Sequence, residues 1–187
     1  VKPIGRKKIK RLKKVIFTEA NKFNFQFKIL NSTHKGHAIS LAKKSVNEKA
    51  NAIIACGGDG TINEIAGILM GKKIPLGIIP MGSGNGIAGH FNIPSNLSEA
   101  INIIVKGYDV KVDVGHFNEK YFLGNLGFGF ESTFIKYYNK KGLHGLHAYC
   151  LAFFKAIKSF NYPKLKVEWE GNYRKLRPLV LLFSNLK

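Results

Sequence analysis

The order of apolar and polar residues in the first part of the chain predicts two helices and one strand. In Arg6–Phe17, apolar residues recur at helical spacing while Lys and Arg fill the other face, which is typical of an amphipathic helix. Phe23–Ile29 alternates apolar and polar residues, the period of a half-buried strand. A second helix is expected to begin at Gly36, with apolar residues along its inner side.

The middle of the chain contains two short, wholly apolar runs. Ala52–Cys56 ends at a glycine pair and Leu76–Ile79 ends at a proline, so both are predicted to be buried parallel strands. Thr61–Met70 between them has helical spacing. The alternation of strand and helix up to about Gly107 predicts an α/β domain with a parallel sheet over residues 1–107.

The pattern changes after Tyr108, and residues 108–187 are predicted to form a second, β-rich antiparallel domain. A strongly apolar helix is expected over Leu146–Phe160. Strands are expected at Asp109–Phe117 and Lys120–Leu126, joined by a turn at Asn118–Glu119, and at Lys164–Glu170 and Leu176–Ser184.

Composition supports a folded, basic protein. The 187 residues include 30 Lys and Arg against 11 Asp and Glu, a net charge of +19, and the 45% of hydrophobic residues excludes wholesale disorder. The charge is uneven: residues 1–49 carry +12, residues 50–107 are neutral and residues 108–187 carry +7. Two cysteines exclude a disulfide framework and fit a reducing cytoplasm. The basic surface and the candidate chemistry therefore lie in different segments.

A glycine-rich loop, Cys56–Thr61, stands between the first apolar strand and the following helix. Its glycines allow close backbone approach to a ligand, and the helix N-terminus favours negative charge, so a phosphate is the predicted occupant. The Asp59 carboxylate would repel a phosphate in direct contact with it. It is instead expected to be a Mg²⁺ ligand, directly or through water, or a base that accepts the proton of an attacking hydroxyl.

A second loop, Pro80–Gly86, has the same position after the next strand. Ligands bind at the carboxyl ends of parallel strands, so the two loops are expected to face each other across one cleft. The alternative is that both are ordinary tight turns in which glycine serves only the backbone.

With these loops the sequence resembles a known family. Gly57–Gly67 (GGDGTINEIAG) and Pro75–Asn85 (PLGIIPMGSGN) are similar to the diacylglycerol kinase catalytic-domain family of lipid kinases, which includes sphingosine and ceramide kinases and bacterial relatives. Ser32–Ala38, Val112–Gly115 and Gly127–Glu131 also resemble family segments. The resemblance implies a Rossmann-like, doubly wound parallel sheet that binds ATP, followed by a β-rich antiparallel domain that is incomplete here.

The resemblance also implies roles for individual residues. Asp59 matches the acidic residue assigned to catalysis or, through Mg-ATP, to the metal, and Glu131 matches an acidic position near the lipid hydroxyl. The implied nucleotide-binding residues are Ser32, Gly57, Gly58, Asp59, Gly60, Thr61, Ile62, Asn63, Glu64, Gly82, Ser83, Gly84 and Asn85.

The two ends of the chain depart from the family pattern. Lys2 stands where the family has Asn, with no strand before it, and the chain stops at Lys187, where the family continues to a further acidic element. We therefore expect a fragment at both ends, which puts the activity of this chain by itself in question.

The predicted function is an ATP- and Mg²⁺-dependent lipid kinase, cytoplasmic and peripheral at the inner face of the membrane. The alternatives are a kinase of a soluble substrate such as NAD, whose kinases share a GGDG loop, and a catalytically inactive, basic membrane-binding relative. The expected partners are the lipid substrate, an anionic membrane surface and, as an open alternative, a second copy in a homodimer; nucleic acid is not expected. The aromatic residues of Leu146–Phe160 fit either core packing or a wall for an acyl chain.

Overall fold

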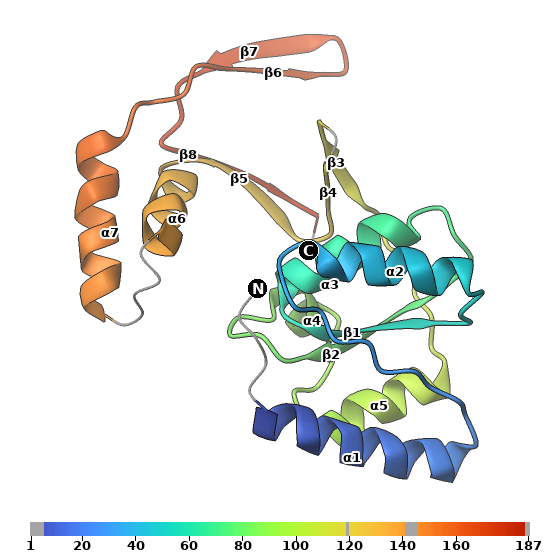
Figure 1. Ribbon diagram of the computed structural model, residues 1–187. Helices are drawn as coiled ribbons and strands as arrows, with labels where there is room; N and C mark the ends of the chain where they lie inside the picture. Colours follow the sequence, from blue (N-terminus) through green and yellow to red (C-terminus); the bar gives the residue numbers. More distant parts are fainter. Residues whose placement is uncertain (1–5, 119, 141–145, 186–187) are drawn as a thin grey trace. The chain divides into compact units, whose positions relative to one another are not determined.

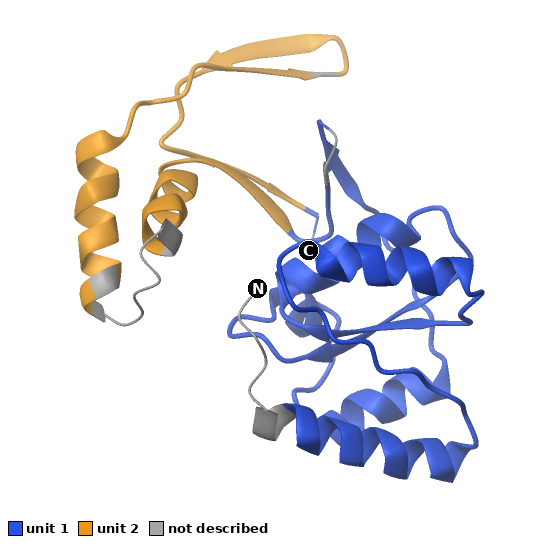
Figure 2. Cartoon of the chain, in the orientation of Figure 1, with its two compact units in different colours: residues 1–124, 185–187 blue, residues 125–184 orange. Residues whose placement is uncertain are grey.

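A computed structural model of the chain describes residues 6–118, 120–140 and 146–185 (Figure 1). The chain falls into two compact units (Figure 2). Unit 1 comprises Val1–Gly124 and Asn185–Lys187, and unit 2 comprises Asn125–Ser184. The predicted domain boundary after Gly107 lies within unit 1, and the assignment of a substrate domain from residue 108 onward stays a prediction.

The centre of unit 1 is a pair of parallel strands, β1 (Ile53–Gly57) and β2 (Leu76–Pro80). They pair along their whole length, so that Gly57 lies opposite Pro80. Helix α3 (Asp59–Leu69) connects them. The two predicted strands and the helix between them are confirmed, with bounds shifted by one or two residues.

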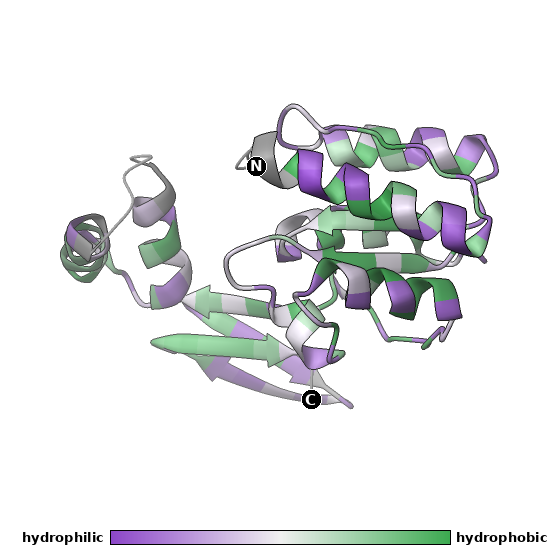
Figure 3. Ribbon diagram, turned by 90° about the horizontal axis from the view of Figure 1, so that it is seen from below, coloured by the Kyte–Doolittle hydropathy of each residue, from purple (hydrophilic) through white to green (hydrophobic). Residues whose placement is uncertain are grey.

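Helices cover both faces of this strand pair (Figure 1): α2 (His37–Asn47) and α3 on one side, α1 (Arg6–Phe23) and α5 (Leu97–Lys106) on the other. Successive strand residues point to opposite faces, so Ile78 packs with α2 and α3 while Ile79 packs with α1 and α5. Figure 3 shows hydrophobic residues along the two central strands of unit 1 and both hydrophobic and hydrophilic residues on the helices around them. Unit 1 is therefore an α/β arrangement with a core on each side of two strands.

The predicted strand over Phe23–Ile29 is wrong. Helix α1 continues to Phe23, and Asn24 turns the chain with a φ of 50°. Beyond it, Phe25, Phe27 and Ile29 are half-buried while Gln26 and Lys28 between them are exposed, so the alternation persists in an extended segment. The described residues supply no neighbouring strand for this segment. Alternation determines which side is buried, but a strand also needs a partner for its hydrogen bonds.

Unit 1 ends in short elements. Helix α4 (Gly86–His90) follows the second glycine loop. Strands β3 (Gly115–Phe117) and β4 (Lys120–Phe122) form an antiparallel pair. The predicted strand at Asp109–Phe117 is therefore confirmed only over its last three residues.

The predicted strand Lys120–Leu126 is interrupted. Bends at Leu123–Gly124 separate β4 from β5 (Asn125–Gly129), because Leu123 turns into the core of unit 1. A turn was predicted at Asn118–Glu119, before this strand. Asn118 lies in a turn, and Glu119 lies outside the described residues.

The strands of unit 2 pair antiparallel. β5 pairs with β8 (Val180–Ser184), and β6 (Leu165–Trp169) pairs with β7 (Asn172–Leu176). The strand predicted over Leu176–Ser184 is confirmed over Val180–Ser184, which is β8, whereas its first residue ends β7. Pro178 lies in the gap, consistent with the lack of an N–H that a strand could donate.

Unit 2 also contains two helices, α6 (Phe130–Lys140) and α7 (Leu146–Ser159). Helix α7 confirms the helix predicted from Leu146. Helix α6 was not predicted, although Phe130, Phe134 and Tyr138 recur at a spacing of four residues, which is helical. The fold is thus mixed α/β. None of the described helices is both long and apolar enough to cross a membrane.

Candidate functional site

Two glycine loops leave the carboxyl ends of β1 and β2 side by side. The Met81 N–H donates to the Gly57 carbonyl at 2.9 Å, which extends the strand pairing into the loops. Next to this bond Gly58 and Gly82 meet backbone to backbone: a Cβ added to Gly82 would lie 2.6 Å from the Gly58 Cα. Only glycine fits there without displacing a loop. The loops therefore lie side by side in direct contact, and the expected cleft between them stays a prediction.

Asp59 fastens the two loops to each other. Its Oδ2 accepts the Gly86 N–H and its Oδ1 accepts the Ile87 N–H, both at 3.0 Å. The carboxylate thus lies at the amino end of α3, to which it belongs, and at the amino end of α4, where negative charge is favourable. No local pattern in the sequence indicates this clamp. The catalytic and metal-binding roles of Asp59 stay predictions, and a carboxylate retains further lone pairs for them.

The amino end of α3 carries no side-chain cap. Gly58 precedes the helix, and its carbonyl accepts the Thr61 N–H at 3.0 Å. A Cβ on Gly57 would lie 2.9 Å from the Thr61 Cβ, so this glycine also allows a close approach. The N–H groups of Asp59 and Gly60 come before the first helical hydrogen bond, as at any helix start. The loop therefore presents backbone donors of the kind that bind anions.

Asn85 shapes the second loop from within. Its Oδ1 accepts the Gly82 N–H at 2.8 Å, and its Nδ2 donates to the Gly82 carbonyl at 3.0 Å. Asn85 has a φ of 54°, in the left-handed region that Asn tolerates better than most residues. Ser83 and Gly84 are exposed at the tip of the loop. The amide of Asn85 thus holds the loop in shape.

Three α3 residues implied in nucleotide binding have other surroundings. The Ile62 side chain is fully buried in the core. The Asn63 amide bonds to the β4 region, donating to the Tyr121 carbonyl at 2.7 Å and accepting the Leu123 N–H at 2.9 Å. Glu64 is half-buried, and its Oε2 has no hydrogen-bond partner among the described residues. Nucleotide contact by these residues stays a prediction, which for Ile62 requires the backbone.

Ser32 is exposed in the segment before α2, and its contact with a nucleotide stays a prediction. Its neighbours form a cluster that the sequence did not indicate. The Thr33 N–H donates to His37 Nδ1 at 3.1 Å, and the His34 and His37 rings stack with centroids 4.7 Å apart. Because Gly36 gives α2 no side-chain cap, this cluster orders the chain where the helix begins.

In unit 2, Glu131 lies in a groove of about 280 Å³. The groove is lined by Asn125, Gly127, Glu131, Ser132, Ile135 and Leu182. Gly127 lies close beneath the carboxylate, since a Cβ there would be 3.2 Å from the Glu131 Oε2. Polar and apolar side chains therefore line the same small depression, at the start of α6.

Asp59 and the glycine loops fit Mg²⁺ carried by a nucleotide. Within the described ranges, no three His, Cys, Asp or Glu side chains gather in a way that could hold a metal ion. Mg²⁺ usually keeps several waters and binds one or two carboxylates together with substrate phosphates. One carboxylate beside backbone N–H groups is compatible with that coordination, whereas a metal site built from protein ligands alone would need more of them.

Cys56, directly before the first glycine loop, is not suited to nucleophilic chemistry. Burial raises the pKa of its thiol to about 11, because desolvation disfavours the thiolate. The side chain packs against the core that contains Ile79. The thiol is therefore protonated at neutral pH and serves as a small core residue.

The sequence matches known kinases. The family model for the diacylglycerol kinase catalytic domain matches residues 3–117. Diacylglycerol kinase of Staphylococcus aureus is 33% identical over 142 residues, which cover 73% of this chain and 45% of that protein. The chain thus spans about half the length of the curated relatives that it matches.

Solved structures agree with the sequence match. The crystal structure of a diacylglycerol kinase from Bacillus anthracis has a TM-score of 0.63 and 25% identity, covering 84% of this chain and 52% of that chain. Another structure from the same bacterium has a TM-score of 0.70 and 24% identity over 94% of this chain and 59% of its own. Since the family model matches more than half of the chain, the predicted family is confirmed: this chain belongs to the diacylglycerol kinase catalytic-domain family.

Proposed function

We propose that this chain is the nucleotide-binding part of an ATP-dependent lipid kinase, which transfers the γ-phosphoryl group to a diacylglycerol-like or sphingoid hydroxyl. Membership of the diacylglycerol kinase family supports a kinase. The observation that carries the proposal is the contact of Gly58 with Gly82, which joins two glycine loops beside an uncapped helix start. We also propose that β1 and β2 belong to a doubly wound sheet whose carboxyl edge holds the nucleotide.

The backbone of the two loops would bind the phosphates. Gly60, Ser83 and Gly84 are exposed, and a Cβ on Gly60 would meet nothing within 4 Å, so a ligand can approach the chain there. The N–H groups at the start of α3 would donate to phosphate oxygens. ATP would supply the transferred phosphoryl group, and Mg²⁺ would offset the charge on its phosphates.

Asp59 has two proposed tasks. Through the Gly86 and Ile87 N–H groups it keeps the second loop against the first. Through its remaining lone pairs it would hold the metal, or orient and deprotonate the lipid hydroxyl. Both tasks require the carboxylate rather than a neutral amide.

The lipid would contact unit 2. The Glu131 groove combines a carboxylate with the apolar side chains of Ile135 and Leu182, a mixture suited to a hydroxyl attached to an apolar chain. We propose that Glu131 accepts a hydrogen bond from the lipid head group. Peripheral association with the inner face of the membrane, a β-rich substrate domain and a cytoplasmic location belong to the same proposal.

Nucleotide binding tests the glycine contact. Gly82→Ala places a methyl group 2.6 Å from the Gly58 Cα, and relieving such overpacking costs about 1–3 kcal/mol. We expect ATP affinity, measured by calorimetry with Mg²⁺ present, to fall by about tenfold or more. Gly89→Ala is the matched control, because a Cβ there meets nothing within 4 Å. Equal affinity of both variants, or no binding of ATP to the unaltered chain, would refute the proposal.

Phosphate transfer tests the substrate class. The chain is incubated with Mg-ATP and, in parallel, diacylglycerol or sphingosine in detergent micelles, or NAD. Transfer to either lipid supports the proposal. Transfer to NAD alone would contradict it and favour a kinase of a soluble substrate. Binding to anionic vesicles with neither ATP binding nor transfer would favour an inactive membrane-binding relative.

A further inference from the structure

The chain between α5 and β3 exposes apolar side chains that no described element covers. Tyr108, Val110 and Val112 are 77%, 72% and 43% exposed. Charged residues alternate with them and are exposed as well, namely Asp109, Lys111 and Asp113. We call Tyr108–Asp113 the linking segment, and Figure 1 shows it as a stretched run of chain outside any helix or strand. Successive side chains of a stretched chain point to opposite sides, so the apolar residues form a row on one side and the charges lie on the other.

The backbone of the linking segment resembles a strand without a partner. None of its residues has a positive φ, and no strand among the described residues pairs with it. The Asn185 Nδ2 donates to the Asp113 carbonyl at 2.6 Å, so this edge of the segment faces Asn185. The N–H and C=O groups of neighbouring residues point to opposite edges, which leaves those of Tyr108, Val110 and Val112 on the free edge. An unpaired strand edge can pair with another chain.

The order of charges in the linking segment is complementary to itself. When two copies pair antiparallel with Val110 opposite Val110, Asp109 of each copy lies opposite Lys111 of the other. Tyr108 then lies opposite Val112, which is a favourable pair of an aromatic and a β-branched side chain. A pairing centred on Asp109 or on Lys111 would instead place like charges opposite each other, which is destabilising.

We propose that the linking segment pairs antiparallel with the same segment of a second copy of the chain, with Val110 on the twofold axis. A pairing centred on Val112 would place Val110 opposite Val114, which packs against the core of unit 1. The charge order selects a second copy over an unrelated strand, because one segment supplies both signs at matching positions. So short an interface buries much less than the roughly 1,200 Å² of a stable complex, so the dimer is weak. The inference goes beyond the proposed kinase function, and its test requires neither ATP nor lipid transfer.

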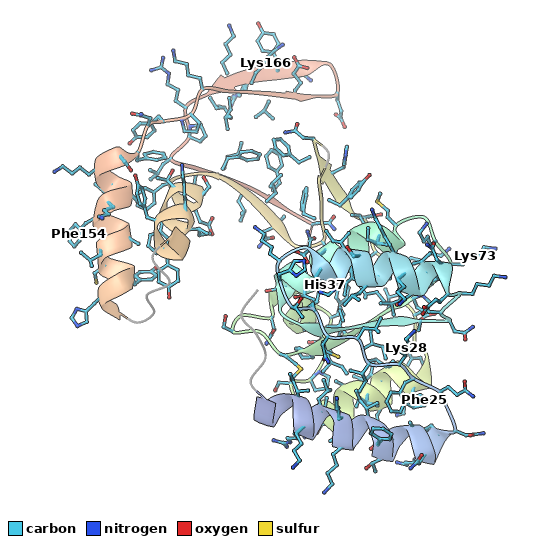
Figure 4. All side chains as sticks on the ribbon, viewed as in Figure 1. Phe25, Lys28, His37, Lys73, Phe154 and Lys166 are labelled. Atoms are coloured by element: carbon cyan, nitrogen blue, oxygen red, sulfur yellow. The ribbon has the colours of Figure 1, made fainter. Side chains whose placement is uncertain are left out.

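Cysteine cross-linking tests the position of the twofold axis. Val110→Cys is combined with Cys150→Ser, because Cys150 is exposed and could cross-link by itself. The Cα atoms of directly opposite strand residues lie about 5.5 Å apart, within the range of a disulfide. The matched control is Phe154→Cys with Cys150→Ser, because Phe154 is 68% exposed on α7 of unit 2, where Figure 4 labels it. We expect a mild oxidant to give a covalent dimer of the Val110→Cys variant faster than of the control.

A charge exchange tests the pairing of Asp109 with Lys111. Sedimentation equilibrium at protein concentrations up to about 1 mM measures the dissociation constant of a weak dimer. Asp109→Lys and Lys111→Asp should each raise this constant by about tenfold or more, because each places like charges opposite each other twice. The two substitutions together restore opposite charges and should return the constant to that of the unaltered chain. Lys155→Asp is the control for net charge, at an exposed lysine of α7.

The outcomes separate a second copy from other occupants of the segment. Faster cross-linking at Val110→Cys and restoration by the double exchange support the proposal. A chain that stays monomeric would overturn it, as would a double exchange that leaves the circular dichroism spectrum unaltered but fails to restore the dimer. Equal cross-linking at Phe154→Cys would also overturn it, because the copies would then meet through α7 or at random. If the chain stays monomeric and neutral detergent micelles protect the thiol of Val110→Cys from alkylation, lipid covers the apolar row and the proposal is wrong.

Discussion

The hydrogen bonds of Asp59 predict that this carboxylate stabilises the fold independently of any catalytic role. Asp59→Asn keeps the size of the side chain but removes its charge and turns an NH₂ group towards one of the two donors, Gly86 N–H or Ile87 N–H. A hydrogen bond to a charged group contributes about 1.5–3 kcal/mol when buried.

The two bonds are not equally protected. The bond to Gly86 is exposed and the bond to Ile87 is partly buried, so each contributes less than a fully buried bond. Asn retains one neutral bond at most. We therefore expect a loss of about 2 kcal/mol in the free energy of unfolding, or about 4–8 °C in Tm for a chain of this length.

Urea unfolding of both proteins measures the loss, and amide hydrogen exchange locates it at Gly86 and Ile87. Glu99→Gln is the control, because Glu99 is also an acid in the first turn of a helix but is exposed. An Asp59→Asn variant with unaltered stability and unaltered exchange at both amides would refute this reasoning. If such a variant had also lost phosphate transfer, Asp59 would act on the substrates alone.

Two further predictions concern Asn63 and the cysteines. Asn63→Ala removes the bonds to Tyr121 and Leu123, so the free energy of unfolding in urea should fall by about 1–3 kcal/mol, whereas the exposed control Asn47→Ala should change it little. Burial raises the pKa of Cys56 in the folded chain to about 11, whereas the thiol of an unfolded chain ionises near a pH of about 8.5. The stabilisation that comes from keeping the Cys56 thiol protonated is therefore complete below a pH of about 8.5, and it is lost as the pH rises through about 11. Alkylation at pH 8 followed by mass spectrometry should modify Cys150 first; equal rates would contradict the burial of Cys56.

The strands before the two glycine loops show which elements can be predicted from short sequence patterns. Short apolar runs ending in glycine or proline correctly predicted β1 and β2, because a buried parallel strand and its turn are both encoded within a few residues. The same reasoning was wrong at Phe23–Ile29. There the alternation determined which side is buried, but a strand would need hydrogen bonds to a neighbour that the described residues do not supply.

The sequence by itself predicted the order β1, α3, β2 at the centre of unit 1, the two glycine loops that follow these strands and the family to which the chain belongs. Only the tertiary structure showed that Gly58 and Gly82 touch, that Asp59 spans both loops and that the Asn63 amide is anchored to β4. The physical reason is the range of the interactions. Periodicity and turn chemistry act between residues a few positions apart, whereas the bonds of Asp59 and Asn63 join residues 27 to 60 positions apart. Such bonds exist only once the strands and helices have packed.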